Sequence, residues 1–321
     1  MSSYIIRRLL LLIPTLFLVT IIVFFTVRLI PGDVIERMAW EQMGGQGIDI
    51  AVQMESLKQK LGLDLPLHVQ YGRWMGNIIL HGDLGKSLWT SVPVIEEIGV
   101  RFPVSFELGF MGILIALIIA VPIGIYSAIR QDTIGDYIAR SFAIIFIAVP
   151  SFWIGTMVMV YPSIWWGWTP PISYISFAEN PIENLKQMVI PAFILGMVMS
   201  GVTMRMTRTM MLEVLRQDYI RTAWSKGLKE RVVIFRHALK NAMIPVISLI
   251  GLQVPVMVGG SVVLEQIFVL PGIGRLLIDV LSSRDYLMVS GINLLMAFFI
   301  LAVNLLVDLT YSWLDPRVSY K

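Results

Sequence analysis

Long apolar runs, separated by shorter polar segments, dominate the hydrophobic pattern of the 321-residue chain. About six of these runs reach the ~20 residues that a helix needs to cross the hydrocarbon core of a bilayer. They cover residues 9–30, 104–129, 138–161, 188–211, 243–267 and 286–314. The pattern predicts an all-α integral membrane protein. Residues 1–30 would hold the first transmembrane helix, 31–103 an extracytoplasmic insert, and 104–321 the remaining transmembrane helices.

The composition supports this class. Hydrophobic residues make up 56% of the chain and charged residues only 15%, which leaves too little polar surface to cover a soluble globule of this length. The chain has no cysteine, so a disulfide framework and thiolate chemistry are excluded. The net charge of +3 does not favour nucleic-acid binding, because an excess of Lys and Arg in a membrane protein more often records its topology.

The basic residues of the short loops predict the orientation. If the six spans alternate in direction, the basic positions fall on one side: Arg7 and Arg8, Arg130 and Arg140, residues 216–240, and Arg317 and Lys321. Since cytoplasmic loops carry the excess of Lys and Arg, this side is the cytosol and both termini are cytoplasmic. The first run is too long for the apolar part of a signal peptide, which favours an uncleaved span. The insert 31–103 is then external, with short helices expected near 55–61 and 68–80.

Catalytic patterns are weak. The run Gly85-Lys86-Ser87 resembles the end of a phosphate-binding loop, but Leu80 stands where the first glycine is required and the predicted topology places it outside the cell. The three histidines, His68, His81 and His237, lack the spacing of a metal site. An intramembrane hydrolase remains open only through residues that the fold would bring together.

Polar side chains within the predicted spans are candidates for a translocation path, because ionisable and amide groups in a membrane usually face the interior of a helix bundle. They are Glu107, Gln253, Glu265, Asn293, Asn304 and Asp308. For Glu107, Glu265 and Asp308, a position near a membrane interface is an equally good interpretation. We take Gln253, Glu265, Asn293 and Asn304 as the candidates for the path.

A basic polar island at residues 218–245 separates two of the spans. Its first part has helical spacing, with Ile220, Ala223, Trp224 and Gly227 on one face and Arg221, Ser225 and Lys229 on another. A second helical pattern runs through Val232, Phe235 and Leu239. Two interpretations stand: a basic loop that lies on anionic lipid headgroups, or a helix that docks a cytosolic partner.

Several collinear motifs resemble the integral membrane permease subunits of ATP-binding-cassette importers, in the branch that serves dipeptides, oligopeptides, nickel and some oligosaccharides. The motifs are RLIPGD at 28–33, LGLDLPLHVQYGRW at 61–74, GDLGKS at 82–87, RQDYIRTAWSKGL followed by RHALKNAMIP in the island, PGIGRLL at 271–277 and NLLVDLTYSWLDPR at 304–317. The resemblance implies that residues 212–243 are the cytoplasmic EAA loop of this family, which contains a coupling helix for the ATPase. It implies as contacts Arg221, Thr222, Ala223, Lys226, Gly227 and Leu228. The chain departs from many permeases by having Arg-Thr-Ala in place of Glu-Ala-Ala, followed by Trp224 and Ser225.

The same resemblance implies a multi-pass permease of a prokaryotic cytoplasmic membrane that is not itself an enzyme. Its expected partners are a homologous second permease, two ATPase subunits that bind ATP and magnesium, an extracytoplasmic solute-binding protein and membrane lipid. Transport of peptides or a related small solute would follow by alternating access. A secondary transporter or channel that works without ATPases is the alternative, and the substrate is left open between dipeptide, oligopeptide, nickel and glycan.

Overall fold

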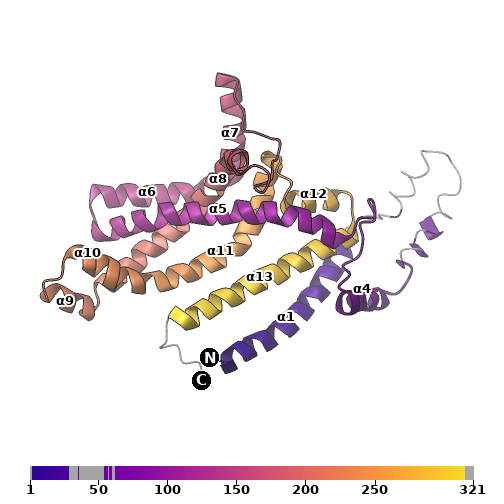
Figure 1. The fold of residues 1–321 in the computed structure, drawn as a ribbon, viewed down its shortest axis with the longest axis horizontal. Coiled ribbons are helices and arrows are strands. Elements are labelled where there is room, and N and C mark those ends of the chain that lie inside the picture. Colours follow the sequence, from indigo (N-terminus) through magenta and orange to yellow (C-terminus); the bar gives the residue numbers. More distant parts are fainter. Residues whose placement is uncertain (1, 29–34, 36–53, 57, 60–61, 315–321) are drawn as a thin grey trace. The chain divides into compact units, whose positions relative to one another are not determined.

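The computed structural model describes residues 2–28, 35, 54–56, 58–59 and 62–314 (Figure 1). Within them the chain is helical, and its extended pairing is limited to an isolated bridge between Lys86 and Pro93. The helices are α1 (Ser2–Arg28), α4 (Leu67–His81), α5 (Val94–Ile129), α6 (Ile134–Ala148), α7 (Ser151–Trp166), α8 (Pro181–Leu215), α9 (Asp218–Ser225), α10 (Glu230–Val232), the π-helical turn η1 (Val233–Ala238), α11 (Leu239–Ile267), α12 (Ile273–Ser282) and α13 (Tyr286–Leu314).

The long helices confirm the all-α membrane class. In the described part, five helices are long and apolar enough to cross a bilayer, and a sixth span is possible if α6 and α7 count as one. The run 138–161 was expected to be one helix, but α6 and α7 meet at an angle of 88°. Pro150 explains the break, because it has no N–H to continue the helix and it forces the preceding residue out of the helical region. Val149 accordingly has an extended backbone, with φ −83° and ψ 122°.

The chain folds into two compact units. The first contains residues 1–5, 102–275 and 300–321, and the second contains residues 6–101 and 276–299. Helices α1, α5, α12 and α13 therefore contribute residues to both units.

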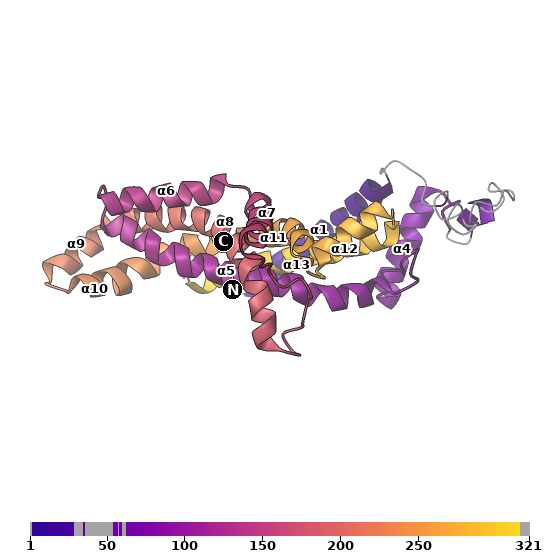
Figure 2. The ribbon, with the colours of Figure 1, turned by 90° about the horizontal axis from the view of Figure 1, so that it is seen from above.

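In the first unit, α8 is surrounded by α5, α6 and α11 (Figures 1 and 2). Glycines bring the backbones close together, as is common where membrane helices pack. A Cβ atom at Gly196 of α8 would lie 2.8 Å from the carbonyl oxygen of Gly112 on α5. One at Gly201 would lie 2.7 Å from the carbonyl oxygen of Ala143 on α6. A side chain at either glycine would force these helices apart.

The second unit is held partly by polar contacts around Asp285, which precedes α13. The Asp285 carboxylate accepts hydrogen bonds from the Ser87 hydroxyl at 2.7 Å and from the backbone N–H of Met288 at 3.2 Å, so it caps α13. Burial raises the pKa of Asp285 above its ordinary value, against the opposing effect of these hydrogen bonds. Ser87, the last residue of the run that resembles a phosphate loop, is thus engaged inside the protein.

Helix α4 of the same unit confirms the short helix expected near residues 68–80. The other expected helix, near 55–61, lies partly outside the described residues. The next helix, α5, begins at Val94, ten residues before the predicted start of the span at Val104.

Candidate functional site

Helix α9, which begins the basic island, is an eight-residue amphipathic helix. Ile220 and Ala223 are buried, with 0% and 6% of their surfaces exposed. Tyr219 and Trp224 are 42% and 45% exposed. The sequence analysis had placed Trp224 on the same face as Ile220. The structure corrects this point, since the inward face is narrower than the predicted one.

The buried face of α9 packs into a cluster formed by residues from five elements. We call this set the α9 cluster: Ile125 and Ala128 of α5, Met211 of α8, Ile220 and Ala223 of α9, Val233, Ile234 and Ala238 of η1, and Ala242 of α11. All of its members are buried. Helix α9 is therefore anchored to the ends of the long helices around α8 and is not a loosely tethered loop.

The six residues that the family resemblance implied as contacts lie together on α9 and the turn that follows it. Ala223 points into the α9 cluster. The other five are exposed: Arg221, Thr222, Lys226, Gly227 and Leu228. The Arg221 guanidinium lies 3.4 Å from the carboxylate of Asp218, one turn earlier. Gly227 has a φ of +72°, which ends the helix in a conformation that suits glycine.

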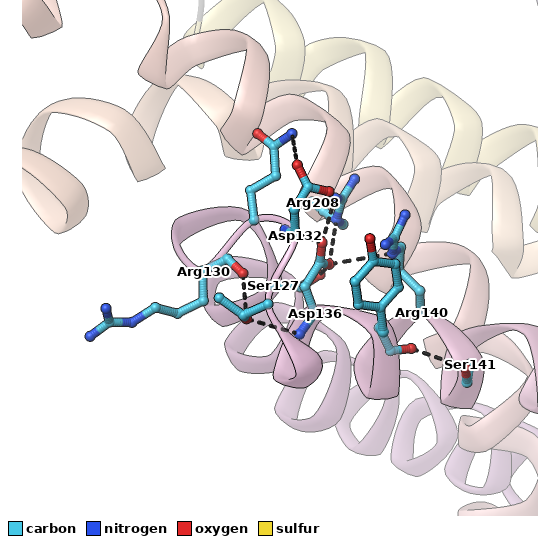
Figure 3. A network of polar contacts seen from close by, with 10 residues as sticks. Ser127, Arg130, Asp132, Asp136, Arg140, Ser141 and Arg208 are labelled. Carbon is cyan, nitrogen blue, oxygen red and sulfur yellow. Dashed lines mark hydrogen bonds and ion pairs between the residues drawn. The ribbon is translucent and has the colours of Figure 1, made fainter.

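A network of polar contacts lies beside the α9 cluster, centred on Asp136 of α6 (Figure 3). The Asp136 side chain is fully buried, and Arg208 of α8 donates to both of its oxygens at 2.9 and 2.8 Å. The Ser127 hydroxyl of α5 donates to one oxygen, and the backbone N–H of Asp132 donates to the other at 3.0 Å. Arg140, one turn along α6, lies 3.6 Å from the same carboxylate. One buried charge thus joins α5, α6, α8 and the turn between α5 and α6.

Local sequence explains how α6 presents Asp136. Thr133 is the N-cap of α6, and its hydroxyl accepts a hydrogen bond from the Asp136 N–H at 3.4 Å. An acid in the first turn is also favoured by the helix dipole. Our sequence analysis missed this network. Its signals were a Thr-x-x-Asp start before an apolar run, and Arg208 as a charge within an apolar helix.

Two of the four path candidates lie on α11, and both have internal partners. Gln253 is 8% exposed, and its amide donates to the Thr203 hydroxyl of α8 at 3.0 Å. Glu265 is fully buried. It accepts a hydrogen bond from the Ser105 hydroxyl of α5 at 2.7 Å and another from the backbone N–H of Arg275 at 3.0 Å.

Glu265 organises the loop of the PGIGRLL motif. The Ser105 hydroxyl that donates to Glu265 also accepts a hydrogen bond from the N–H of Ile273, at the start of α12. A Cβ atom at Gly272 would collide with the Glu265 carboxyl group, so the loop can close over the acid only with glycine at this position.

The other two path candidates lie on α13, in different units. Asn293 belongs to the second unit and donates to the carbonyl oxygen of Val289 at 2.9 Å. Asn304 belongs to the first unit and is half-buried. Of the further polar candidates, Glu107 accepts a 3.4 Å hydrogen bond from Asn184, and the side chain of Asp308 lies outside the described residues.

Two family models cover nearly the whole chain. Residues 120–320 match the binding-protein-dependent transport system inner membrane component, and residues 1–109 match the N-terminal part of a membrane component of such systems. A putative peptide transport system permease protein of Brucella suis is 38% identical over 320 residues, covering 100% of both chains. The dipeptide transport system permease protein DppB of Escherichia coli K12 is 40% identical over 344 residues, again covering 100% of both. DppB of Alkalihalophilus pseudofirmus is 39% identical over 342 residues. The chain belongs to the family of inner membrane components of binding-protein-dependent transport systems.

Proposed function

We propose that this chain is one of two membrane-spanning subunits of an ATP-driven peptide importer, and that α9 is the helix through which an ATPase subunit moves it. The observation that carries the proposal is the form of α9. It is a short helix with an exposed outer face, and its inner face is fixed in a cluster that includes α5, α8 and α11.

A coupling helix needs both properties. Its outer face must offer side chains to a groove on the ATPase, and Tyr219, Arg221, Trp224, Lys226 and Leu228 are exposed there. Aromatic and arginine side chains contribute more than others to protein interfaces. Its inner face must be seated firmly, because a loose helix would absorb the movement of the ATPase without passing it on. We take the α9 side of the protein as cytoplasmic, which also places both termini there, as the distribution of Lys and Arg predicts.

The names of the relatives support peptides as the transported class. Within that class, the external binding protein would select and deliver the substrate, and this chain would supply part of the path. ATP and magnesium would bind to two partner ATPase subunits, and a homologous second permease would complete the path. Gln253, Glu265, Asn293 and Asn304 remain predictions as residues that line it.

Uptake by the assembled importer tests the proposal. The chain is reconstituted in liposomes with its partner permease, ATPases and binding protein, and uptake of a labelled dipeptide is measured with and without ATP. We expect uptake to require both ATP and the ATPases. If liposomes that contain the permeases without ATPases accumulate the dipeptide at the same rate, the chain works as a secondary transporter or channel and the proposal is wrong.

A pair of glycine variants tests the role of α9 itself. Gly227→Arg places a large cation at the end of α9, and Gly167→Arg places the same group at the end of α7. Both glycines have positive φ, 72° and 63°, and a Cβ atom at either position would meet no neighbouring group within 4 Å, so the backbone strain is matched. We expect Gly227→Arg to lower uptake by about tenfold or more, because a tenfold effect needs a loss of only about 1.4 kcal/mol of binding free energy between α9 and the ATPase. Gly167→Arg should stay near the wild-type rate. Equal losses in both variants would remove the support for coupling through α9.

A further inference from the structure

We infer that the buried ion pair between Asp136 and Arg208 makes α6, α8 and the part of α5 in the first unit, residues 102–129, one rigid body that follows α9 during transport. These two residues are then positioning residues for coupling. The inference rests on the proposed role of α9. It adds which helices move with α9 and which side chains hold them together.

The arrangement of donors around Asp136 is the first argument. Its two carboxylate oxygens receive hydrogen bonds from Ser127 on α5, from the Asp132 N–H in the α5–α6 turn and, through both oxygens, from Arg208 on α8 (Figure 3). A bidentate pair between a guanidinium and a carboxylate fixes orientation as well as distance. The start of α6 is therefore held to α5 and α8 in one geometry.

The position of the pair relative to α9 is the second argument. Ser127 lies between Ile125 and Ala128, the two residues that α5 contributes to the α9 cluster. Arg208 precedes Met211, the α8 member of that cluster, by one helical turn. The contacts of Asp136 and the α9 cluster therefore involve the same ends of α5 and α8.

Helix α6 itself contributes no residue to the α9 cluster as the described residues define it. At this end of the protein, its polar connection to the α9-bearing helices runs through Asp136. A movement of α9 would reach α5 and α8 directly by packing. It would reach the start of α6 through the ion pair and through the close packing of Gly135 on Tyr126 of α5.

Close backbone packing continues the connection along the helices. A Cβ atom at Gly124 of α5 would lie 2.7 Å from Thr207 Cβ of α8, next to Arg208. Further along α8, Gly201 packs equally closely against Ala143 of α6. Such contacts leave little room for the three helices to slide past one another, because close-packed interiors have few voids. If Arg208 were removed, Asp136 would keep Arg140 at 3.6 Å, Ser127 and the Asp132 N–H, but it would lose the bidentate pair that ties the start of α6 to α8.

Distance measurements between spin labels test the inference in the complete importer. The chain has no cysteine, so two introduced cysteines in it label without ambiguity. Ser141→Cys places one label on an exposed position of α6, and Gln217→Cys places the other directly before α9, outside the predicted ATPase contacts. Distances are measured in lipid nanodiscs without nucleotide and with trapped ATP.

In the wild-type background we expect one narrow distance distribution that shifts by less than about 2 Å between the two states, the range in which a backbone counts as unmoved. Arg208→Gln should broaden it and should lower the number of peptides imported per ATP hydrolysed. Arg208→Lys keeps the charge but loses the bidentate geometry, and should give an intermediate result. Arg205→Gln is the matched control, because Arg205 is exposed, lies one turn away on α8 and forms no ion pair with any described residue.

Two results would overturn the inference. One is a wild-type distance that changes by more than about 5 Å, roughly one helical turn, between the two states. The other is an Arg208→Gln importer whose distances and coupling match those of Arg205→Gln. If Arg208→Gln fails to assemble, the wild-type distances and Arg208→Lys still decide the question. ATP-independent uptake by wild type would contradict the proposed function instead, and the two failures are therefore distinguishable.

Discussion

The replacement Ile220→Ala should loosen α9 from the protein without altering its exposed face. Ile220 is fully buried and belongs to the α9 cluster. Alanine removes about three methyl or methylene groups, at ~0.8 kcal/mol each, and leaves a cavity. Large-to-small changes of this kind cost about 2–5 kcal/mol in well-packed cores. We expect about 2–4 kcal/mol here, since α9 lies at an end of the helices and can relax.

Hydrogen exchange of the α9 amides measures this loss directly. A cost of about 2–4 kcal/mol raises the open fraction of α9 by roughly 30-fold to 700-fold, at 1.4 kcal/mol for each factor of ten. The assay follows the peptide that spans α9 in the nucleotide-free importer. Trp224→Ala is the control, because it removes a larger side chain that is already 45% exposed.

The same two variants distinguish the packing of α9 against the protein from the contact of its outer face with the ATPase. Ile220→Ala should reduce import for each ATP hydrolysed while the outer face of α9 still reaches the ATPase. Trp224→Ala should instead weaken binding of the ATPase and leave the exchange rate of α9 nearly unchanged. If both variants speed exchange at α9 equally, or if Ile220→Ala changes it by less than about threefold, the cluster does not anchor the helix as we argue.

Three further outcomes follow from the packing and the polar contacts. Gly201→Val would place a side chain against the carbonyl oxygen of Ala143. We expect the free energy of unfolding to fall by about 1–3 kcal/mol, measured as a lower thermal unfolding temperature. Gly76→Val is the control, because Gly76 lies in an open position of α4 and the new side chain should have little steric effect. The Glu265 carboxylate accepts one hydrogen bond on each oxygen, and Glu265→Gln would turn an amide NH₂ toward one of these two donors. We expect the free energy of unfolding to fall by about 1–3 kcal/mol, read in the same assay. Burial raises the pKa of Asp285, so its contribution to stability is complete below the ordinary value of 3.8 and is lost as the pH rises through the higher folded value. The difference in unfolding temperature between wild type and Asp285→Asn should therefore shrink as the pH is raised from 4 toward 8, and a difference that grows would contradict this sign.

The transmembrane class could be predicted from the sequence because lipid imposes a simple requirement. Every backbone polar group in the bilayer must be satisfied within a helix, so each crossing appears as one long apolar run. The amphipathic start of the basic island could be predicted for a related reason, since Ile220 and Ala223 repeat at helical spacing among polar residues. Periodicity did not determine how wide the buried face would be, and Trp224, which was placed on that face, is 45% exposed.

The 88° break between α6 and α7 shows a different limit. Pro150 lies in an apolar run that satisfies the length rule, and many membrane helices tolerate a proline by a modest kink. Whether a proline kinks a helix or ends it depends on what its freed carbonyl groups and its neighbours contact. That information lies in the fold and not in the run itself.

The Asp136 network was missed because it is non-local. Asp136 and Arg208 are 72 positions apart, and each alone is compatible with a residue near a membrane interface. Only the packing of α6 against α8 makes them partners. A charge in an apolar helix therefore indicates that a partner exists, but it does not say which one.

The polar residues of the spans can now be separated by what they contact. Gln253 and Asn293 use their amide groups on partners within the protein, and Glu265 holds the loop before α12. Each of these two amides donates one hydrogen bond there and keeps a second N–H and a carbonyl oxygen. Asn304 differs, because it is half-buried and no hydrogen bond joins its side chain to another described residue. The three amide candidates therefore stay predictions as residues that contact a solute, whereas both carboxylate oxygens of Glu265 are already hydrogen-bonded within the fold.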